Sequence, residues 1–210
     1  MWKLIRFRQR LKRANTPEFL GYWFFCLNVL EGLTMNAIIF HGSAPHATAN
    51  KFWYQNISNS LINHGISSIV VNLPQLDQEP LTDTLEKINK MDLEFTKDTI
   101  LIGHSAGTNI IFALLEQHLE TPVRAVYLIA GYSQPNGMKH TTLKESYDWT
   151  TVKNNAKEFF ILNSFNDPFK CDEKQGKVLF DHLGGTLILR NDGHFMQKHQ
   201  PLLLTLLNQY

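Results

Sequence analysis

From Met35 onward, short apolar runs alternate with longer segments of helical character, and this alternation limits the folds open to the chain. Each apolar run predicts a buried β-strand, because Ile, Val, Leu and Phe follow one another with little polar alternation. The predicted strands cover residues 37–40, 68–72, 99–102, 125–129, 159–162 and 186–189. Strands that alternate with helices form a parallel sheet covered on both faces. We therefore expect a three-layer α/β/α sandwich with a mostly parallel, Rossmann-like sheet of about six strands.

The segments between these strands predict helices. They cover residues 50–64, 81–90, 108–119, 172–183 and 201–208. Gly65 and Gly184 directly follow two of them, as is usual for residues that end a helix. Residues 132–149 contain Pro135 and Gly137 but no clear period, which indicates a long loop or a minimal lid. We expect a single domain over residues 35–210.

Residues 1–34 differ from the rest of the chain. Basic side chains precede any acid there, and residues 19–30 are nearly all apolar. A signal peptide or anchor is one interpretation, although the apolar run is shorter than the roughly 20 residues that span a bilayer. An amphipathic surface or targeting helix is the second. The third is that Met35 is the true or an alternative start. In each case we expect this segment to lie outside the domain.

Charge and cysteine content narrow the function classes. A net charge of +1 gives no electrostatic footprint for nucleic acid, so no nucleic-acid partner is expected. Cys26 and Cys171 lack the spacing of a zinc site or a disulfide framework. A reducing, cytoplasmic location is therefore the expectation, with membrane association or targeting through residues 1–34 as the alternative. Membrane contact is expected only if that segment is retained.

Gly103-His104-Ser105-Ala106-Gly107 directly follows a predicted strand and precedes a helical segment. This GxSxG pattern is typical of a sharp turn between strand and helix, which lifts a serine hydroxyl clear of the sheet. The two glycines lack the Cβ atoms that would collide with neighbouring backbone. Ser105 is therefore the candidate nucleophile, and an inert turn between strand and helix is the alternative. His104 lies inside the turn, and we expect it to shape the pocket rather than to act as a base.

A serine hydroxyl is a weak nucleophile until a base takes its proton, so this hypothesis requires a histidine nearby. His194 follows the last predicted strand, in the segment NDGHF. Because the carboxyl ends of parallel strands share one edge of the sheet, a loop there can reach Ser105. His194 is therefore the candidate general base.

A carboxylate must hold the imidazole in the correct tautomer. Asp167 fits this role, because it follows the predicted fifth strand in a turn that Pro168 makes rigid. An Asp that only forms the turn before Pro is the alternative. Asp192 is the main rival, but it lies two residues before His194 and is expected to brace that loop. The order Ser, Asp, His along the chain agrees with this type of site.

Negative charge develops on the carbonyl oxygen as the serine attacks, so two N–H donors are needed to bind it. The turn predicts one donor, the backbone N–H of Ala106. The loop after the first strand should supply the other, since Gly42 lets the chain approach the site closely. We assign the N–H of Ser43 to this role, with Ala44 as the near alternative.

These motifs carry a family resemblance. The segments NAIIFHG, GHSAG, YDWTTV, FFILNSFNDPF and GHF resemble the small, nearly lidless α/β-hydrolases of the retinoblastoma-binding-protein-nine type. The resemblance runs from Met35 to the end of the chain and leaves out residues 1–34. It implies a minimal α/β-hydrolase fold, a triad of Ser105, Asp167 and His194, and pocket roles for Trp149 and Phe195. Members are generally assigned as serine hydrolases with ill-defined natural substrates.

The residues together predict hydrolysis of a small ester, thioester or activated amide through an acyl-enzyme, without a metal or organic cofactor. A carboxylesterase-like activity is preferred over peptidase action. The expected partner is a small acyl substrate in an open, shallow pocket. Candidate pocket residues are His41, Gly42, Trp149, Phe165, Phe169 and Phe195. Plain packing in the core is the alternative for the Trp and the three Phe residues. A non-catalytic interaction protein on the same scaffold is the alternative, because fold does not settle function. The residues predict neither the oligomeric state nor the acyl group.

Overall fold

Six strands form one parallel sheet in the order β2-β1-β3-β4-β5-β6, in a computed structural model that describes residues 35–117 and 120–210. The strands are β1 Asn36–Phe40, β2 Ser67–Val71, β3 Thr99–His104, β4 Ala125–Ile129, β5 Phe159–Ser164 and β6 Thr186–Arg190. All six predicted strands are confirmed. The predicted extension over residues 1–34 lies outside the described residues.

The helices confirm the five predicted positions, although the helix predicted over residues 108–119 covers residues 106–116. They are α3 Tyr54–Asn63, α4 Leu81–Asn89, α5 Ala106–Glu116, α6 Trp149–Asn154, α7 Glu173–Leu183 and α8 Pro201–Leu207. Helix α3 begins at Tyr54 rather than at Asn50, because Phe52 has φ 52°, which a right-handed helix does not allow. Helix α6 was not predicted. It is short, and the Asp148 side chain caps it by accepting from Thr151 N–H at 3.1 Å.

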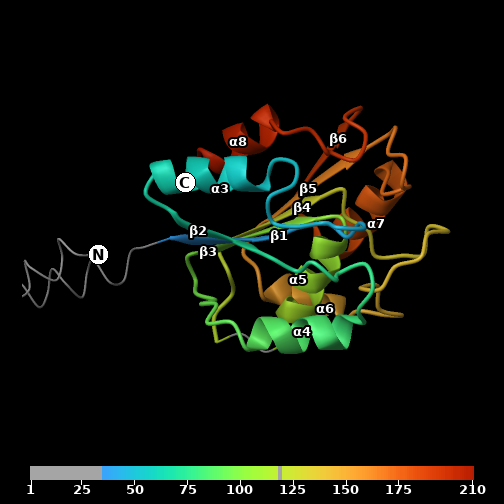
Figure 1. Ribbon diagram of the computed structural model, residues 1–210, viewed down its shortest axis with the longest axis horizontal. Coiled ribbons are helices and arrows are strands. Elements are labelled where there is room, and N and C mark those ends of the chain that lie inside the picture. The colour runs from blue at the N-terminus through green and yellow to red at the C-terminus, as the bar shows by residue number, and fades with distance from the viewer. Residues whose placement is uncertain (1–34, 118–119) are drawn as a thin grey trace, which may run out of the picture. The chain divides into compact units, whose positions relative to one another are not determined.

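The helices cover the sheet in two layers (Figure 1). Alternate residues of a strand face opposite sides, so β1 contributes to both cores. Ile38 and Phe40 pack with residues of α4, α5, α6 and α7. Ala37 and Ile39 pack with residues of α3 and α8. This arrangement is the predicted three-layer sandwich.

The strand order places the loops after β1 and β3 side by side. The chain leaves β1 towards β2, whereas β3 pairs with the other edge of β1, with Phe40 opposite Gly103. Connections that diverge in this way open a crevice at the carboxyl ends of the strands, where α/β proteins bind ligands. Both Gly42 and Ser105 lie just beyond these strand ends.

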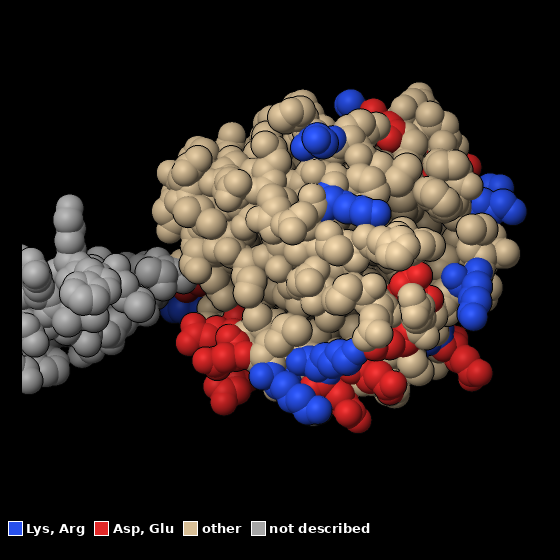
Figure 2. All heavy atoms as spheres, viewed as in Figure 1, with Lys and Arg blue, Asp and Glu red and all other residues tan. Residues whose placement is uncertain are grey.

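The long segment between β4 and α6 contains neither helix nor strand, as predicted. A hydrogen bond links this segment to the loop between β2 and α4, where Thr141 Oγ1 donates to the Leu76 carbonyl at 2.6 Å. Within the described ranges, no helix is long and apolar enough to cross a membrane. On the face shown in Figure 2, Asp and Glu gather mainly on the α4 side, with Lys and Arg interspersed among them.

Candidate active site

Ser105 lies in a strained turn between β3 and α5, with φ 51° and ψ −119°. Its N–H donates to the Ile129 carbonyl of β4 at 2.9 Å, and its carbonyl accepts from Thr108 Oγ1 at 2.7 Å. A serine in such a region of φ and ψ persists only where its surroundings fix it. The turn holds the Ser105 side chain at the carboxyl edge of the sheet, where the residue is 8% exposed.

The glycines of the motif allow α5 to approach β1. A Cβ on Gly107 would lie 2.2 Å from the carbonyl oxygen of Phe40, a distance that no packing change can accommodate. A Cβ on Gly103 would lie 2.8 Å from Ile111 Cδ1 and 3.0 Å from the backbone of Gly107. Both positions therefore require glycine because a Cβ atom would collide with neighbouring atoms, as expected from the sequence.

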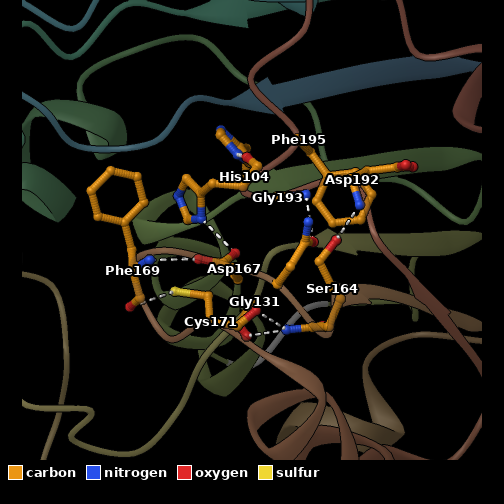
Figure 3. A network of polar contacts seen from close by, with 12 residues as sticks. His104, Gly131, Ser164, Asp167, Phe169, Cys171, Asp192, Gly193 and Phe195 are labelled. Atoms are coloured by element: carbon orange, nitrogen blue, oxygen red, sulfur yellow. Dashed lines mark hydrogen bonds and ion pairs between the residues drawn. The ribbon is translucent and has the colours of Figure 1, made fainter.

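His194 and Asp167 form a buried hydrogen-bonded pair, with Nδ1 of the imidazole 2.8 Å from Oδ2 of the carboxylate. The side chains are 8% and 0% exposed, respectively. The second carboxylate oxygen, Oδ1, accepts from Phe169 N–H at 2.8 Å (Figure 3). Because the carboxylate accepts, Nδ1 carries the proton, and Nε2 of His194 is left as a base.

The loops that carry the pair are bonded to each other. Asn166 Oδ1 accepts from Gly193 N–H at 2.9 Å, and Ser164 Oγ accepts from Asp192 N–H at 3.0 Å (Figure 3). The Asp192 carboxylate pairs with Arg190 Nε at 3.0 Å. The rival carboxylate thus braces the loop, as expected, and Asp167 is the one that contacts the imidazole.

Cys171 lies beside Ser105 and the pair, and no sequence signal pointed to it. Its sulfur lies in a group with a His194 ring nitrogen and an Asp167 carboxylate oxygen, all within 4.8 Å of one another. Burial strongly raises the pKa of this thiol, and the neighbouring Ser105 hydroxyl partly counters that effect. No hydrogen bond among the described side chains joins Ser105 directly to His194. Such contacts are often long in unliganded enzymes and shorten with substrate.

The predicted oxyanion donors flank Ser105. Ala106 is the first residue of α5, so its N–H has no acceptor within the helix. Ser43 N–H makes no hydrogen bond to another described residue. The loop that carries it lies against the turn, since a Cβ on Gly42 would lie 3.2 Å from Ser105 Cβ. Both donors therefore remain predictions with a suitable placement.

The structure separates the predicted Trp and Phe residues of the pocket into two groups, and it buries His41 fully. Phe195 is 1% exposed and belongs to the core, and Trp149 stacks on His182 with ring centroids 4.5 Å apart, at the layer of α6 and α7. By contrast, Phe165 and Phe169 are exposed, and the Phe169 ring lies edge-on to His194 with centroids 4.7 Å apart. Phe169 is the aromatic residue best placed to contact a substrate.

The geometry can be compared with known proteins. The sequence model of the serine hydrolase family matches residues 37–201. The chain belongs to this family. The match makes the protein a serine hydrolase, and it includes Ser105, Asp167 and His194. The narrower likeness to the retinoblastoma-binding-protein-nine type remains a resemblance.

This serine hydrolase is similar to YdeN of Bacillus subtilis, with 23% identity over 173 residues, which cover 79% of this chain and 88% of YdeN. The crystal structure of YdeN has a TM-score of 0.77 and covers 84% of this chain and 98% of its own. Mouse α/β hydrolase domain-containing protein 10 has a TM-score of 0.60 at 14% identity, and the match covers 84% of this chain and 89% of the mouse protein. Est1E of Butyrivibrio proteoclasticus, with ferulic acid bound, has a TM-score of 0.58 at 13% identity, and the match covers 84% of this chain and 87% of Est1E. These likenesses confirm the α/β-hydrolase fold.

Proposed function

We propose that this serine hydrolase cleaves small carboxylic esters, and thioesters or activated amides, through an acyl-enzyme on Ser105. The observation that carries the proposal is the buried 2.8 Å hydrogen bond between His194 and Asp167, next to a serine held in a strained turn. A base oriented by a carboxylate and placed beside a serine is the arrangement that nucleophilic acyl transfer requires.

In the proposed reaction, Nε2 of His194 takes the hydroxyl proton as Ser105 Oγ attacks the substrate carbonyl. Asp167 keeps the imidazole in the Nδ1–H tautomer and stabilises the imidazolium that forms. The N–H groups of Ser43 and Ala106 bind the oxyanion. His194 then gives its proton to the leaving group, and a water molecule activated in the same way releases the acid. Every step uses groups of this chain and water.

The proposed substrates have an apolar acyl group of modest size. Phe169 is 38% exposed and presents an apolar ring beside His194, the proposed general base. Phe165 on the same loop is also exposed. Est1E, which shares the fold, holds ferulic acid, an aromatic acid. An apolar acyl group would gain free energy by covering these rings.

The test is a comparison of p-nitrophenyl acetate with aminoacyl p-nitroanilides, on the wild-type protein and on Ser105→Ala. An amine leaving group needs protonation much more than a phenolate does. An esterase site therefore hydrolyses p-nitrophenyl acetate readily and the anilides hardly at all. We expect ester hydrolysis that Ser105→Ala abolishes. Higher kcat/KM on the anilides would assign the site to peptide hydrolysis instead.

A cytoplasmic location is proposed together with this function. The free thiol of Cys171 supports a reducing compartment. Fractionation of cells that express the full chain tests this, with recovery in the soluble fraction expected. Recovery with membranes would assign a targeting or anchoring role to residues 1–34.

A further inference from the structure

We propose that Tyr54 and His104 are positioning residues, and that one chain of hydrogen bonds through them sets the oxyanion loop and the general base relative to Ser105. This inference rests on the function proposed above and adds two residues to its machinery. Neither side chain hydrogen-bonds to Ser105 Oγ or to a ring nitrogen of His194, although the His104 ring packs against that of His194 with centroids 4.9 Å apart. Tyr54 is the first residue of α3, and His104 immediately precedes Ser105.

The chain of hydrogen bonds has a single direction. His104 Nε2 lies 2.8 Å from the backbone carbonyl of His194, which can only accept, so Nε2 carries the proton. In a neutral ring Nδ1 must then accept, and the Tyr54 hydroxyl donates to it at 2.6 Å. The Tyr54 oxygen in turn accepts from Gly42 N–H at 3.1 Å. Each group has one partner that suits it.

Burial supports this assignment. Tyr54 and His104 are each 1% exposed, so neither can exchange its partner for water. Burial lowers the pKa of His104 to about 3, and the nearby charge of His194 adds to the effect. The ring is therefore neutral at neutral pH. An imidazolium would need a second acceptor where the Tyr54 hydroxyl now donates.

At one end, the series of hydrogen bonds fixes the loop that carries the proposed oxyanion donor. Tyr54 binds the N–H of Gly42, while the Gly42 carbonyl accepts from His41 Nδ1 at 2.8 Å. The carbonyl of Gly42 and the N–H of Ser43 belong to one planar peptide group and point in opposite directions. Holding the carbonyl on the His41 side therefore turns the N–H of Ser43 to the other side.

At the other end, the series of hydrogen bonds fixes the backbone of His194, the general base. The carbonyl of His194 is bound by His104, and the next carbonyl, that of Phe195, accepts from Trp53 Nε1 at 2.8 Å. Trp53 and Tyr54 are neighbours at the start of α3. Hence one helix end holds both the oxyanion loop and the histidine loop. Small displacements of either group lower the rate of the chemical step more than they weaken substrate binding.

The test uses full-length Tyr54→Phe, His104→Gln and His104→Leu with p-nitrophenyl acetate. Tyr54→Phe should lower kcat about 10-fold with KM within about 2-fold. His104→Gln keeps a side-chain N–H that can donate to the His194 carbonyl, whereas His104→Leu keeps neither bond. We expect kcat of the Gln variant to exceed that of the Leu variant by about 5-fold or more.

Tyr127→Phe is the matched control. It also removes a buried tyrosine hydroxyl, one that donates to the Leu206 carbonyl at 3.2 Å on the α8 side of the sheet. Its thermal stability should fall about as far as that of Tyr54→Phe, while kcat stays at the wild-type value. If Tyr54→Phe does not fold, the comparison of the two His104 variants provides the test.

The outcomes separate this inference from the proposed function. A wild-type protein whose Ser105 does not react with a fluorophosphonate contradicts the proposed function itself. A reactive wild type with unchanged kcat in folded Tyr54→Phe, or with equal kcat in the two His104 variants, overturns the positioning role alone. A rise in KM without loss of kcat also overturns it, because that would assign Tyr54 to substrate binding.

Discussion

Nδ1 of His194 lies 2.8 Å from Oδ2 of Asp167, whose other oxygen is held by the N–H of Phe169. The carboxylate therefore has a fixed orientation and one role towards the imidazole. Asp167→Asn should lower kcat for p-nitrophenyl acetate about 10³-fold or more, because an amide can donate to Nδ1 and would stabilise the wrong tautomer.

Asp192→Asn is the control for this substitution. The Asp192 carboxylate pairs with Arg190 at the surface, whereas the hydrogen bond to the His194 ring comes from Asp167. Exposed pairs of this kind contribute roughly 0–1 kcal/mol, so kcat should change less than about 5-fold. A larger loss of kcat in Asp192→Asn than in Asp167→Asn would show that the two carboxylates have been assigned the wrong way round.

Phe169 should control the preference for acyl chain length. Full removal of one methylene from water contributes about 0.8 kcal/mol, so kcat/KM should rise by up to about fourfold per added carbon from acetyl to butyryl esters. Phe169→Ala should flatten this dependence. Phe180→Ala, which removes an equally exposed ring on α7, should leave it unchanged; both residues are 38% exposed. Equal flattening in the two variants would contradict the role of Phe169.

Stability should fall as the pH falls below 6.5, because of His104. Its folded pKa is lowered to about 3, chiefly by burial, so between these values the unfolded chain binds a proton that the folded protein does not. The free energy of unfolding therefore decreases from pH 7 to pH 5, by about 2 kcal/mol from this residue. The lowered pKa of buried His41 acts in the same direction.

Urea denaturation of the wild type and of His104→Gln at pH 7 and pH 5 measures this contribution. The variant loses the proton-binding site in the unfolded chain, so its free energy of unfolding should depend less on pH, by about 2 kcal/mol over this interval. Identical pH dependence in the two proteins would mean that His104 is not held neutral in the folded state.

The Cys171 thiol should be unreactive in the folded protein. It is buried, and burial raises its pKa, so the thiolate that attacks reagents is scarce. In a Cys26→Ser variant, where Cys171 is the remaining thiol, Ellman's reagent should react fully in urea and at least 100-fold more slowly without it. Rapid reaction of the native protein would show that the space beside Ser105 is open to a bulky reagent.

The sequence predicted much of the fold because its signals are local. Runs of Ile, Val and Leu marked each strand, and the GxSxG pattern marked the turn that Gly107 makes possible through its close approach to Phe40. Helix α6 was missed because six residues carry little periodicity, although Asp, the residue at position 148, is one of the types preferred at the N-cap of a helix. The start predicted for α3 was too early because Phe52 has a positive φ, and Phe is not a residue type that indicates this conformation.

The site was less predictable where it depends on distant contacts. His194 and Asp167 could be proposed from their places after two strands, whereas Cys171 and Tyr54 gave no signal. Tyr54 lies 50 positions before the histidine that it binds, at the start of helix α3. Phe195 was expected in the pocket, but its positive φ of 51° lies in a turn that directs its ring into the core. Side-chain direction in a loop depends on backbone angles that sequence patterns do not encode.

The central claim is that Ser105 is made nucleophilic by His194 and Asp167, and fluorophosphonate labelling tests it most directly. Intact-protein and peptide mass spectrometry of the full chain should show one adduct per molecule, located on Ser105, and lost both in Ser105→Ala and after denaturation. A folded protein that stays unlabelled, or that is labelled equally well in Ser105→Ala, would contradict the account. The first of these results would favour a non-catalytic interaction protein on the same fold.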